Sequence, residues 1–125
     1  MRKHIVVIAD DPSNLEAITK LLEHKGYVVS ALPSFSSMQE LAFLRPDCFI
    51  IEEWFPQVSG HAICLMLKAR VQTSPIPVVL VSVSSLFEPM ANLCEADAIL
   101  GKPLIAGELV RVVSSVISRT RAFMS

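Results

Sequence analysis

Apolar residues along the chain form two alternating kinds of segment: short continuous runs, and longer stretches in which they recur every three or four positions. The short runs are rich in valine and isoleucine, which is typical of strands that a parallel sheet buries on both faces. The longer stretches have the spacing of a single apolar helix face. The runs predict strands at residues 5–9, 27–32, 48–51, 78–81 and 98–100, and the stretches predict helices at residues 12–25, 38–44, 60–71, 84–95 and 104–121.

Capping and breaking residues support these limits. Asp11 stands before a proline and suits the N-cap of the first helix, which Gly26 ends. The second helix should stop before Pro46, because a residue that precedes proline avoids the helical conformation. The fourth helix should be short, because Pro89 is tolerated only in a first turn.

Five strands that alternate with five helices predict an α/β fold, a doubly wound five-stranded parallel sheet of the flavodoxin-like (βα)5 type. We expect one domain over residues 1–125, with right-handed crossovers that cover both faces of the sheet. The helix at residues 60–71 is predicted to bury Ile63, Cys64, Leu67 and Val71, and the last helix is predicted to bury Ile105, Leu109, Val112, Val113, Val116 and Ile117.

Composition limits the classes of function. Of the 125 residues 52% are apolar, yet the longest aliphatic run, residues 5–9, is far shorter than the roughly 18 residues that cross a membrane. The carboxylates of Asp10 and Asp11 follow too early for a signal peptide, and a net charge of −1 provides no field to gather nucleic acid. We therefore expect a cytoplasmic protein with no membrane segment and no direct nucleic acid contact. The cysteines are widely spaced and are expected to be reduced core residues: Cys48, Cys64 and Cys94.

Polar side chains follow four of the five predicted strands. Because the carboxyl ends of parallel strands lie along one edge of a sheet, residues far apart in the sequence should converge there. Acidic side chains bind Mg²⁺ with several waters retained, and an ammonium and a hydroxyl suit phosphoryl oxygens. The edge therefore predicts a phosphate site without a glycine-rich loop, built from Asp10, Asp11, Glu52, Ser82 and Lys102.

Several short motifs occur in a fixed order along the chain. Asp10-Asp11 follows the first strand, Glu52 is followed four residues later by Pro56 and eight later by Gly60, Ser82 follows the fourth strand, and Lys102-Pro103 follows the fifth. Each motif alone is weak, but in this order and at these intervals they resemble the receiver domain of two-component response regulators, the CheY-like family. The resemblance covers essentially the whole chain.

The resemblance implies a role for each matching residue. Glu52 stands at the phosphoacceptor position, Ser82 and Lys102 would hold phosphoryl oxygens, and the bond before Pro103 would be cis. Mg²⁺ would be organised by Asp10, Asp11, Glu52 and the backbone carbonyl of Trp54. The implied partners are a histidine kinase and an output domain, with a homodimer through the fourth helix, fifth strand and last helix as a further candidate.

The departures from the family pattern change the expected function. The family's phosphoacceptor is an aspartate, and Glu52 adds a methylene that places its carboxylate in the space of a phosphoryl group, within reach of Lys102. Val83 would narrow the phosphoryl entrance, and Ile99 replaces the aromatic switch residue. The interval from Ser82 to Lys102, 20 positions, is shorter than the family's, so the fourth helix is expected to be altered.

These departures favour a pseudo-receiver, a protein-interaction module that is not phosphorylated on aspartate and is not an enzyme. The alternative is a working receiver that takes a phosphoryl group from a histidine kinase with Mg²⁺. Blander interpretations also stay open: Asp11 as a helix cap only, Lys102 as a solvated turn residue, and Glu52 as an inert acid. A nucleotide or flavin enzyme is disfavoured because the glycines form no phosphate-binding motif. The chain is expected to be either a stand-alone receiver or a part of a longer regulator.

Overall fold

The computed structural model describes residues 2–53, 55, 58–82 and 95–124. Five strands form one parallel sheet in the order β2-β1-β3-β4-β5. The strands are β1 (His4–Ile8), β2 (Val28–Leu32), β3 (Cys48–Glu52), β4 (Val78–Ser82) and β5 (Ala98–Gly101), and the helices are α1 (Pro12–His24), α2 (Met38–Leu44), α3 (Gly60–Lys68) and α5 (Ala106–Met124). The predicted doubly wound, flavodoxin-like fold is confirmed, whereas the helix predicted at 84–95 lies outside the described residues.

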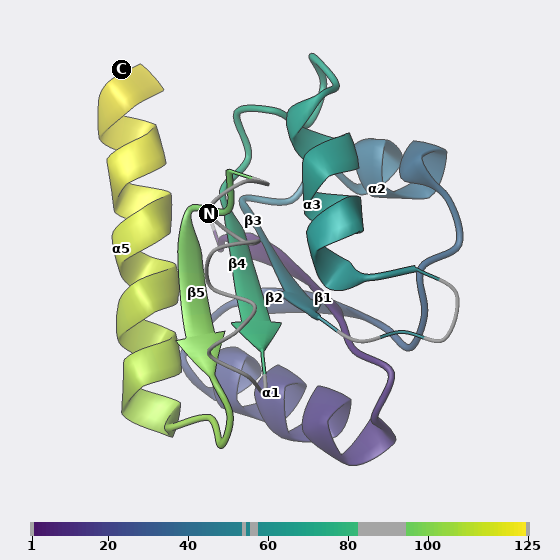
Figure 1. Ribbon diagram of the computed structural model, residues 1–125. Coiled ribbons are helices and arrows are strands. Elements are labelled where there is room, and N and C mark those ends of the chain that lie inside the picture. The colour runs from purple at the N-terminus through teal and green to yellow at the C-terminus, as the bar shows by residue number, and fades with distance from the viewer. Residues whose placement is uncertain (1, 54, 56–57, 83–94, 125) are drawn as a thin grey trace.

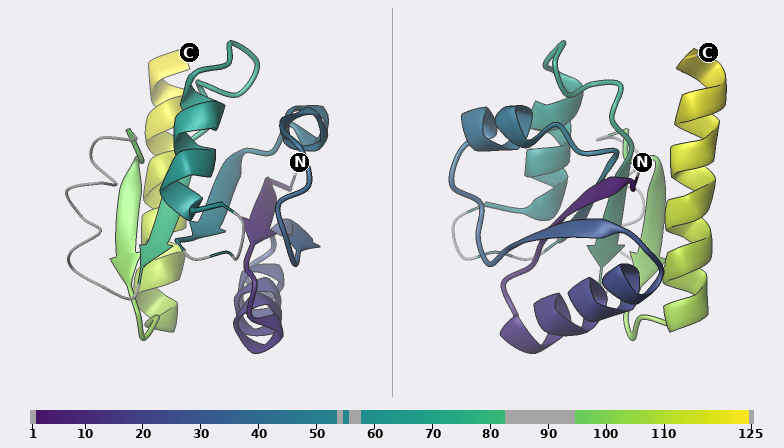
Figure 2. Two further views of the ribbon diagram at one scale, coloured as in Figure 1. Left: turned by 45° about the vertical axis from the view of Figure 1, so that its right-hand side comes forward. Right: turned by 180° about the vertical axis from the view of Figure 1, so that it is seen from behind.

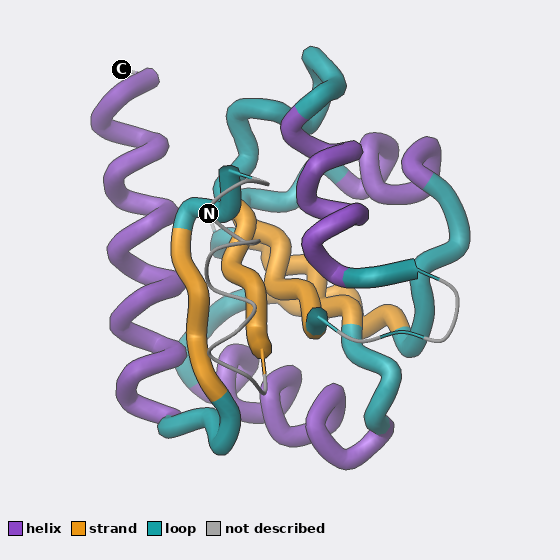
Figure 3. The backbone as a smooth tube through the Cα atoms, viewed as in Figure 1, coloured by secondary structure: helices purple, strands orange, loops and turns teal. Residues whose placement is uncertain are grey.

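Helices cover both faces of the sheet (Figures 1 and 2). Side chains of β1 alternate between the two faces: Ile5 and Val7 pack in one core cluster with residues of α1 and α5, and Val6 and Ile8 pack in the other with residues of α2 and α3. Figure 3 shows the strands as a central layer between helices. A strand buried on both faces needs a continuous apolar run, which is why the short runs of the sequence located the strands.

The thiols of Cys48 and Cys64 are buried, as predicted, whereas Cys94 lies outside the described residues. Burial, with a smaller contribution from Asp97 and Asp47, raises the pKa of the Cys48 thiol well above its ordinary value. The thiol therefore stays protonated at neutral pH and acts as a small apolar residue of β3.

Two residues predicted in the core are exposed. The helix predicted to reach residue 71 ends at Lys68, and Val71 lies in the following turn with 87% of its surface exposed. The last helix begins at Ala106, later than predicted, so Ile105 precedes it and is 64% exposed. Val112, also predicted in the core, is only partly buried. The other predicted core positions of α3 and α5 are confirmed as buried: Ile63, Cys64, Leu67, Leu109, Val113, Val116 and Ile117.

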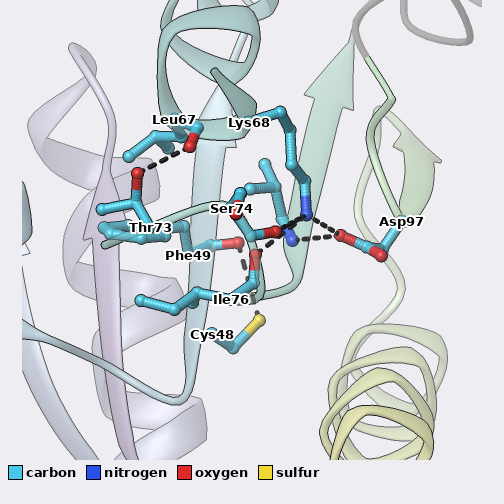
Figure 4. Close-up of polar contacts among 9 residues, drawn as sticks. Cys48, Phe49, Leu67, Lys68, Thr73, Ser74, Ile76 and Asp97 are labelled. Carbon is cyan, nitrogen blue, oxygen red and sulfur yellow. Dashed lines mark hydrogen bonds and ion pairs between the residues drawn. The ribbon is translucent and has the colours of Figure 1, made fainter. Parts of the chain in front are cut away.

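Side chains around the connection from α3 to β4 explain why α3 ends at Lys68, earlier than predicted (Figure 4). The ammonium of Lys68 donates to the carbonyls of Ser74, at 3.3 Å, and Ile76, at 3.0 Å, and it pairs with Asp97 at 2.8 Å. The hydroxyl of Thr73 donates to the Leu67 carbonyl at 2.6 Å. These bonds satisfy carbonyls of the helix end and the turn, so the chain can leave the helix without orphaned polar groups.

None of the helices in the described part of the chain is long and apolar enough to cross a membrane.

Candidate functional site

Strand register brings the predicted site residues to one edge of the sheet. Glu52 is the last residue of β3 and pairs with Val81, and Ser82, the last residue of β4, pairs with Gly101. The backbone N–H of Lys102 donates to the Ser82 carbonyl at 2.9 Å. This edge, where the arrowheads of β4 and β5 end in Figure 1, is the expected ligand-binding edge of an open α/β sheet.

Glu52 and Lys102 form an ion pair across this edge. The ammonium of Lys102 donates to Oε2 of Glu52, and the side chains are 24% and 7% exposed, respectively. The carboxylate comes from the end of β3 and the ammonium from the turn after β5, so the contact joins segments 50 residues apart in the sequence. The pair expected from the longer glutamate side chain is therefore present in the structure.

The second oxygen of the Glu52 carboxylate, Oε1, takes no part in the ion pair with Lys102. Oε1 is buried and has no hydrogen-bond partner among the described residues. A buried acceptor without a donor costs free energy, which a cation or a donor at this point would recover. The carboxylate is thus bonded through one oxygen, and the other is a buried acceptor without a donor among the described residues.

Asp10 and Asp11 lie on the same edge, after β1, and both are exposed. Asp11 is the N-cap of α1, and its Oδ1 accepts from the backbone N–H of Ser13 at 2.9 Å. Within the described residues no three His, Cys, Asp or Glu side chains are grouped closely enough to hold a metal ion. The acidic donors therefore share an edge without forming a preassembled cage, although Mg²⁺ requires only one or two carboxylates beside its waters.

The remaining predicted site residues differ in what the structure shows of them. Ser82 is buried at the end of β4, and Ile99 is partly buried and packs on the core cluster on the α2 and α3 side. The Lys102–Pro103 bond is cis, as expected from the resemblance. Val83 and Trp54 lie outside the described residues. Phe55, three residues after Glu52, is 7% exposed and packs in the core.

Glu53 and His61 form a second contact beside the site, which the sequence analysis did not predict. Nδ1 of His61, on α3, lies 2.5 Å from Oε1 of Glu53, whose side chain is 4% exposed. Glu53 is therefore turned away from Lys102, as the alternation of side chains along a strand requires. The only signal in the sequence was an acid after a strand and a histidine in the first turn of the next helix, which is too common to identify a pair.

Gly60 fits where α3 begins against the end of β3. Its backbone N–H donates to the Glu53 carbonyl at 2.6 Å, and a Cβ at this position would overlap the backbone carbonyl of Glu52. Only glycine permits this approach. The glycine eight residues after Glu52 thus fixes the backbone that carries the central carboxylate.

A cavity of about 410 Å³ opens beside the Lys102 turn, between α1 and the start of α5. Apolar side chains line most of it, including Ile18, Leu21, Leu104 and Leu109. Lys102 thus lines this cavity and also pairs with Glu52.

Comparisons with known proteins match nearly the whole chain. A family model described as the response regulator receiver domain matches residues 5–114. The response regulator MprA of Mycobacterium ulcerans is 29% identical over 123 residues, a match that covers 97% of this chain and 53% of that protein. The chain therefore spans about half the length of this curated relative.

Solved structures show the same fold. A response regulator receiver domain protein from Clostridium thermocellum is 25% identical, with a TM-score of 0.85 and coverage of 97% of this chain and 98% of that chain. The receiver domain of a sensor histidine kinase from Pseudomonas aeruginosa, solved with a magnesium ion coordinated in its active site cleft, is 18% identical, with a TM-score of 0.79 and coverage of 94% and 99%. The second likeness concerns the fold alone.

Proposed function

Because the chain belongs to the family of response regulator receiver domains, we propose that it is a pseudo-receiver of a two-component system, in which the Glu52–Lys102 ion pair stands where phosphorylation of an aspartate would act. The proposed activity is protein–protein interaction in signal transduction. The single observation that carries the proposal is that the carboxylate at the phosphoacceptor position already neutralises the ammonium of Lys102.

The ion pair is well suited to hold one conformation. The Glu52 side chain is buried and the Lys102 side chain is partly buried, so removing either partner leaves a poorly solvated charge and should cost more than the roughly 0–1 kcal/mol of an exposed pair. Aspartate is shorter by one methylene, about 1.5 Å of reach. The glutamate therefore makes the contact that a shorter side chain would leave to a phosphoryl oxygen, though with less charge than a phosphate brings.

A working phosphoacceptor is the second candidate, and one observation favours it. Oε1 of Glu52 is buried without a partner among the described residues, and the carboxylates of Asp10 and Asp11 stand on the same edge. Such oxygens fit a hard cation. When bound, Mg²⁺ would neutralise charge on an incoming phosphoryl group, with Glu52, Asp10 and Asp11 as the acidic donors.

Against this candidate stands the position of the nucleophile. In-line attack requires the reacting oxygen to lie close to its productive position, and a displacement of about 1 Å can lower the rate roughly a hundredfold. Oε2 of Glu52 is engaged by Lys102, so the cation that would hold a phosphoryl oxygen is already used by the acceptor itself. Phosphoryl transfer would first have to break this ion pair.

The partners follow from the family. We propose a histidine kinase or an output domain as the protein partner. The match covers 53% of the response regulator from Mycobacterium ulcerans, which is compatible with this chain being part of a longer regulator. A homodimer through β5 and α5 remains a prediction, since the predicted fourth helix of that face lies outside the described residues. Contact with nucleic acid is assigned to no residue of this domain.

Phosphorylation with a small-molecule donor tests the proposal. The native protein and the Glu52→Asp variant are incubated with Mg²⁺ and acetyl phosphate, and the intact masses are measured. We expect no phosphate adduct on the native protein, because its acceptor is paired with Lys102, and an adduct on Glu52→Asp, whose shorter carboxylate frees the ammonium.

Glu52→Gln is the matched control, since it keeps the length of the side chain and removes the nucleophile. A hydroxylamine-labile phosphate that maps to Glu52 of the native protein would overturn the pseudo-receiver proposal in favour of the working phosphoacceptor. If neither protein is modified, the loss extends beyond Glu52, and Val83→Ala combined with Glu52→Asp is the next variant to weigh.

A further inference from the structure

A second surface lies at the opposite edge of the sheet from Glu52. The end of α2 and the turn that follows α3 both precede strands, so they meet at the amino-terminal edge, the end away from the arrowheads in Figure 1. A hollow of about 510 Å³ lies between them. We name it the α2–α3 hollow; its lining residues are Gln39, Ala42, Phe43, Arg45, Arg70 and Gln72.

A large apolar side chain stands in water at this hollow. Phe43 is 85% exposed, although Leu41 of the same short helix is fully buried. Val71, between two lining residues, is 87% exposed. A single exposed apolar residue is ordinary, but an aromatic ring and a valine beside one concave surface are typical of a contact site.

Two guanidinium groups accompany the ring. Arg45 and Arg70 both line the hollow and are exposed, and neither has an ion pair or a side-chain hydrogen bond among the described residues. No acidic side chain lines the hollow. By contrast, the nearby ammonium of Lys68 is already held by Asp97 and by backbone carbonyls. The hollow therefore carries two uncompensated positive charges in a protein whose formal net charge is −1.

The two arginines and the exposed ring indicate what kind of ligand the hollow would bind. Arginine and aromatic residues dominate the binding free energy of protein interfaces, arginine by forked bonds to carboxylates and the ring by apolar contact. Gln39 and Gln72 add amide donors and acceptors that suit a peptide backbone. Among the described residues no glycine lines the hollow, so it has no glycine-rich loop of the kind that cradles nucleotide phosphates.

We infer that the α2–α3 hollow binds an acidic segment of a partner protein, with carboxylates on Arg45 and Arg70 and a large apolar side chain against Phe43. The site is separate from the Glu52 edge, because the whole length of β3 lies between them. The domain would thus hold a partner at one edge while the Glu52–Lys102 pair sets the state of the other.

Selection from a random peptide library tests this inference. A phage-displayed dodecapeptide library is selected against the native domain, and one recovered peptide is titrated into labelled protein by NMR. We expect recovered sequences to combine Asp or Glu with a large apolar residue, and we expect the shifted amides to fall in residues 39–45 and 69–73. The Arg45→Ala/Arg70→Ala variant and Phe43→Ser should each weaken this peptide by about tenfold or more.

Arg111→Ala is the matched control, since Arg111 is exposed on α5 and its loss should leave the affinity within about twofold. All four substituted positions are exposed, so circular dichroism should show that the variants fold like the native protein. The inference is overturned if recovered peptides lack acidic residues, bind the double arginine variant as well as the native protein, or shift amides elsewhere. It is also overturned if an oligothymidylate displaces the peptide at lower concentration, or if Phe43→Ser abolishes a dimer of the native chain in sedimentation. Binding should persist in Glu52→Asp, so the result is independent of the proposed pseudo-receiver function.

Discussion

The start of α3 packs directly against the backbone of Glu52, and Gly60 is the residue that makes this close approach possible. Its missing side chain leaves room for the Glu52 backbone carbonyl, which a Cβ would overlap. Neither partner can yield easily, because β3 is held on both sides by β1 and β4 and the N–H of Gly60 is bonded to the Glu53 carbonyl. The constraint therefore concerns backbone against backbone.

Gly60→Ala should lower the free energy of unfolding by about 1–3 kcal/mol, since overpacking against a rigid neighbour costs this much even though alanine favours a helix. Urea unfolding followed by circular dichroism measures the change. Gly107→Ala on α5 is the matched control: nothing lies within 4 Å of its Cβ position. Its expected effect is neutral or a gain of up to about 1 kcal/mol. Equal stability of the two variants would contradict the account of Gly60.

At the scale of elements, one ammonium connects the end of α3 to the starts of β4 and β5 (Figure 4). Lys68 donates to the carbonyls of Ser74 and Ile76 and pairs with Asp97, which also accepts the N–H of Val78 at 2.8 Å. The side chain of Lys68 is only 11% exposed. Its charge is therefore a structural part of the fold at the edge that carries the α2–α3 hollow.

Lys68→Met should destabilise the domain by roughly 1.5–3 kcal/mol, because two carbonyls and a carboxylate lose a charged donor that little water can replace. Hydrogen exchange should also accelerate at the amides of Ile76 and Val78. Lys20→Met is the control: this lysine pairs with Glu16 at 2.6 Å, but both side chains are mostly exposed, so a change below about 0.5 kcal/mol is expected. A similar small change for Lys68→Met would show that the bonded network adds nothing to stability.

The elements also show what the sequence could and could not predict. Every strand was located to within about one residue at each end, because burial on both faces demands an unbroken apolar run. The end of α3 was misplaced because apolar spacing continues through Val71, while the chain actually turns at Lys68. The turn depends on bonds from Lys68 and Thr73 to residues that only the folded chain brings near, and no periodic pattern encodes them.

The candidate site was predictable to a similar degree. Convergence of Glu52, Ser82 and Lys102 follows from parallel topology, and the extra methylene of Glu52 was enough to predict its ion pair. The Glu53–His61 contact and the hollow between α2 and α3 were not predicted. The contact depends on how α3 lies against the end of β3, and the hollow depends on how α2 lies beside the turn after α3; the sequence pattern specifies neither.

For the whole molecule, the proposed function depends on a standing attraction between two segments that meet at the carboxyl-terminal edge of the sheet, the end of β3 and the turn after β5. The Glu52–Lys102 pair joins the end of β3 to the turn after β5. If the pair sets the conformational state, the two charges must stabilise each other in solution, with a coupling well above that of an exposed pair.

A double-mutant cycle on the free energy of unfolding measures this coupling most directly. The four proteins are the native chain, Glu52→Gln, Lys102→Met and the double variant, unfolded in urea at neutral pH. The account predicts a favourable coupling of about 1–3 kcal/mol, against about 0.3–0.5 kcal/mol for the same cycle at the exposed Glu16–Lys20 pair. If the effects of Glu52→Gln and Lys102→Met on the free energy of unfolding simply add, the two charges do not stabilise each other. The ammonium would then be free for a phosphoryl group, and the proposed role of the ion pair would be wrong.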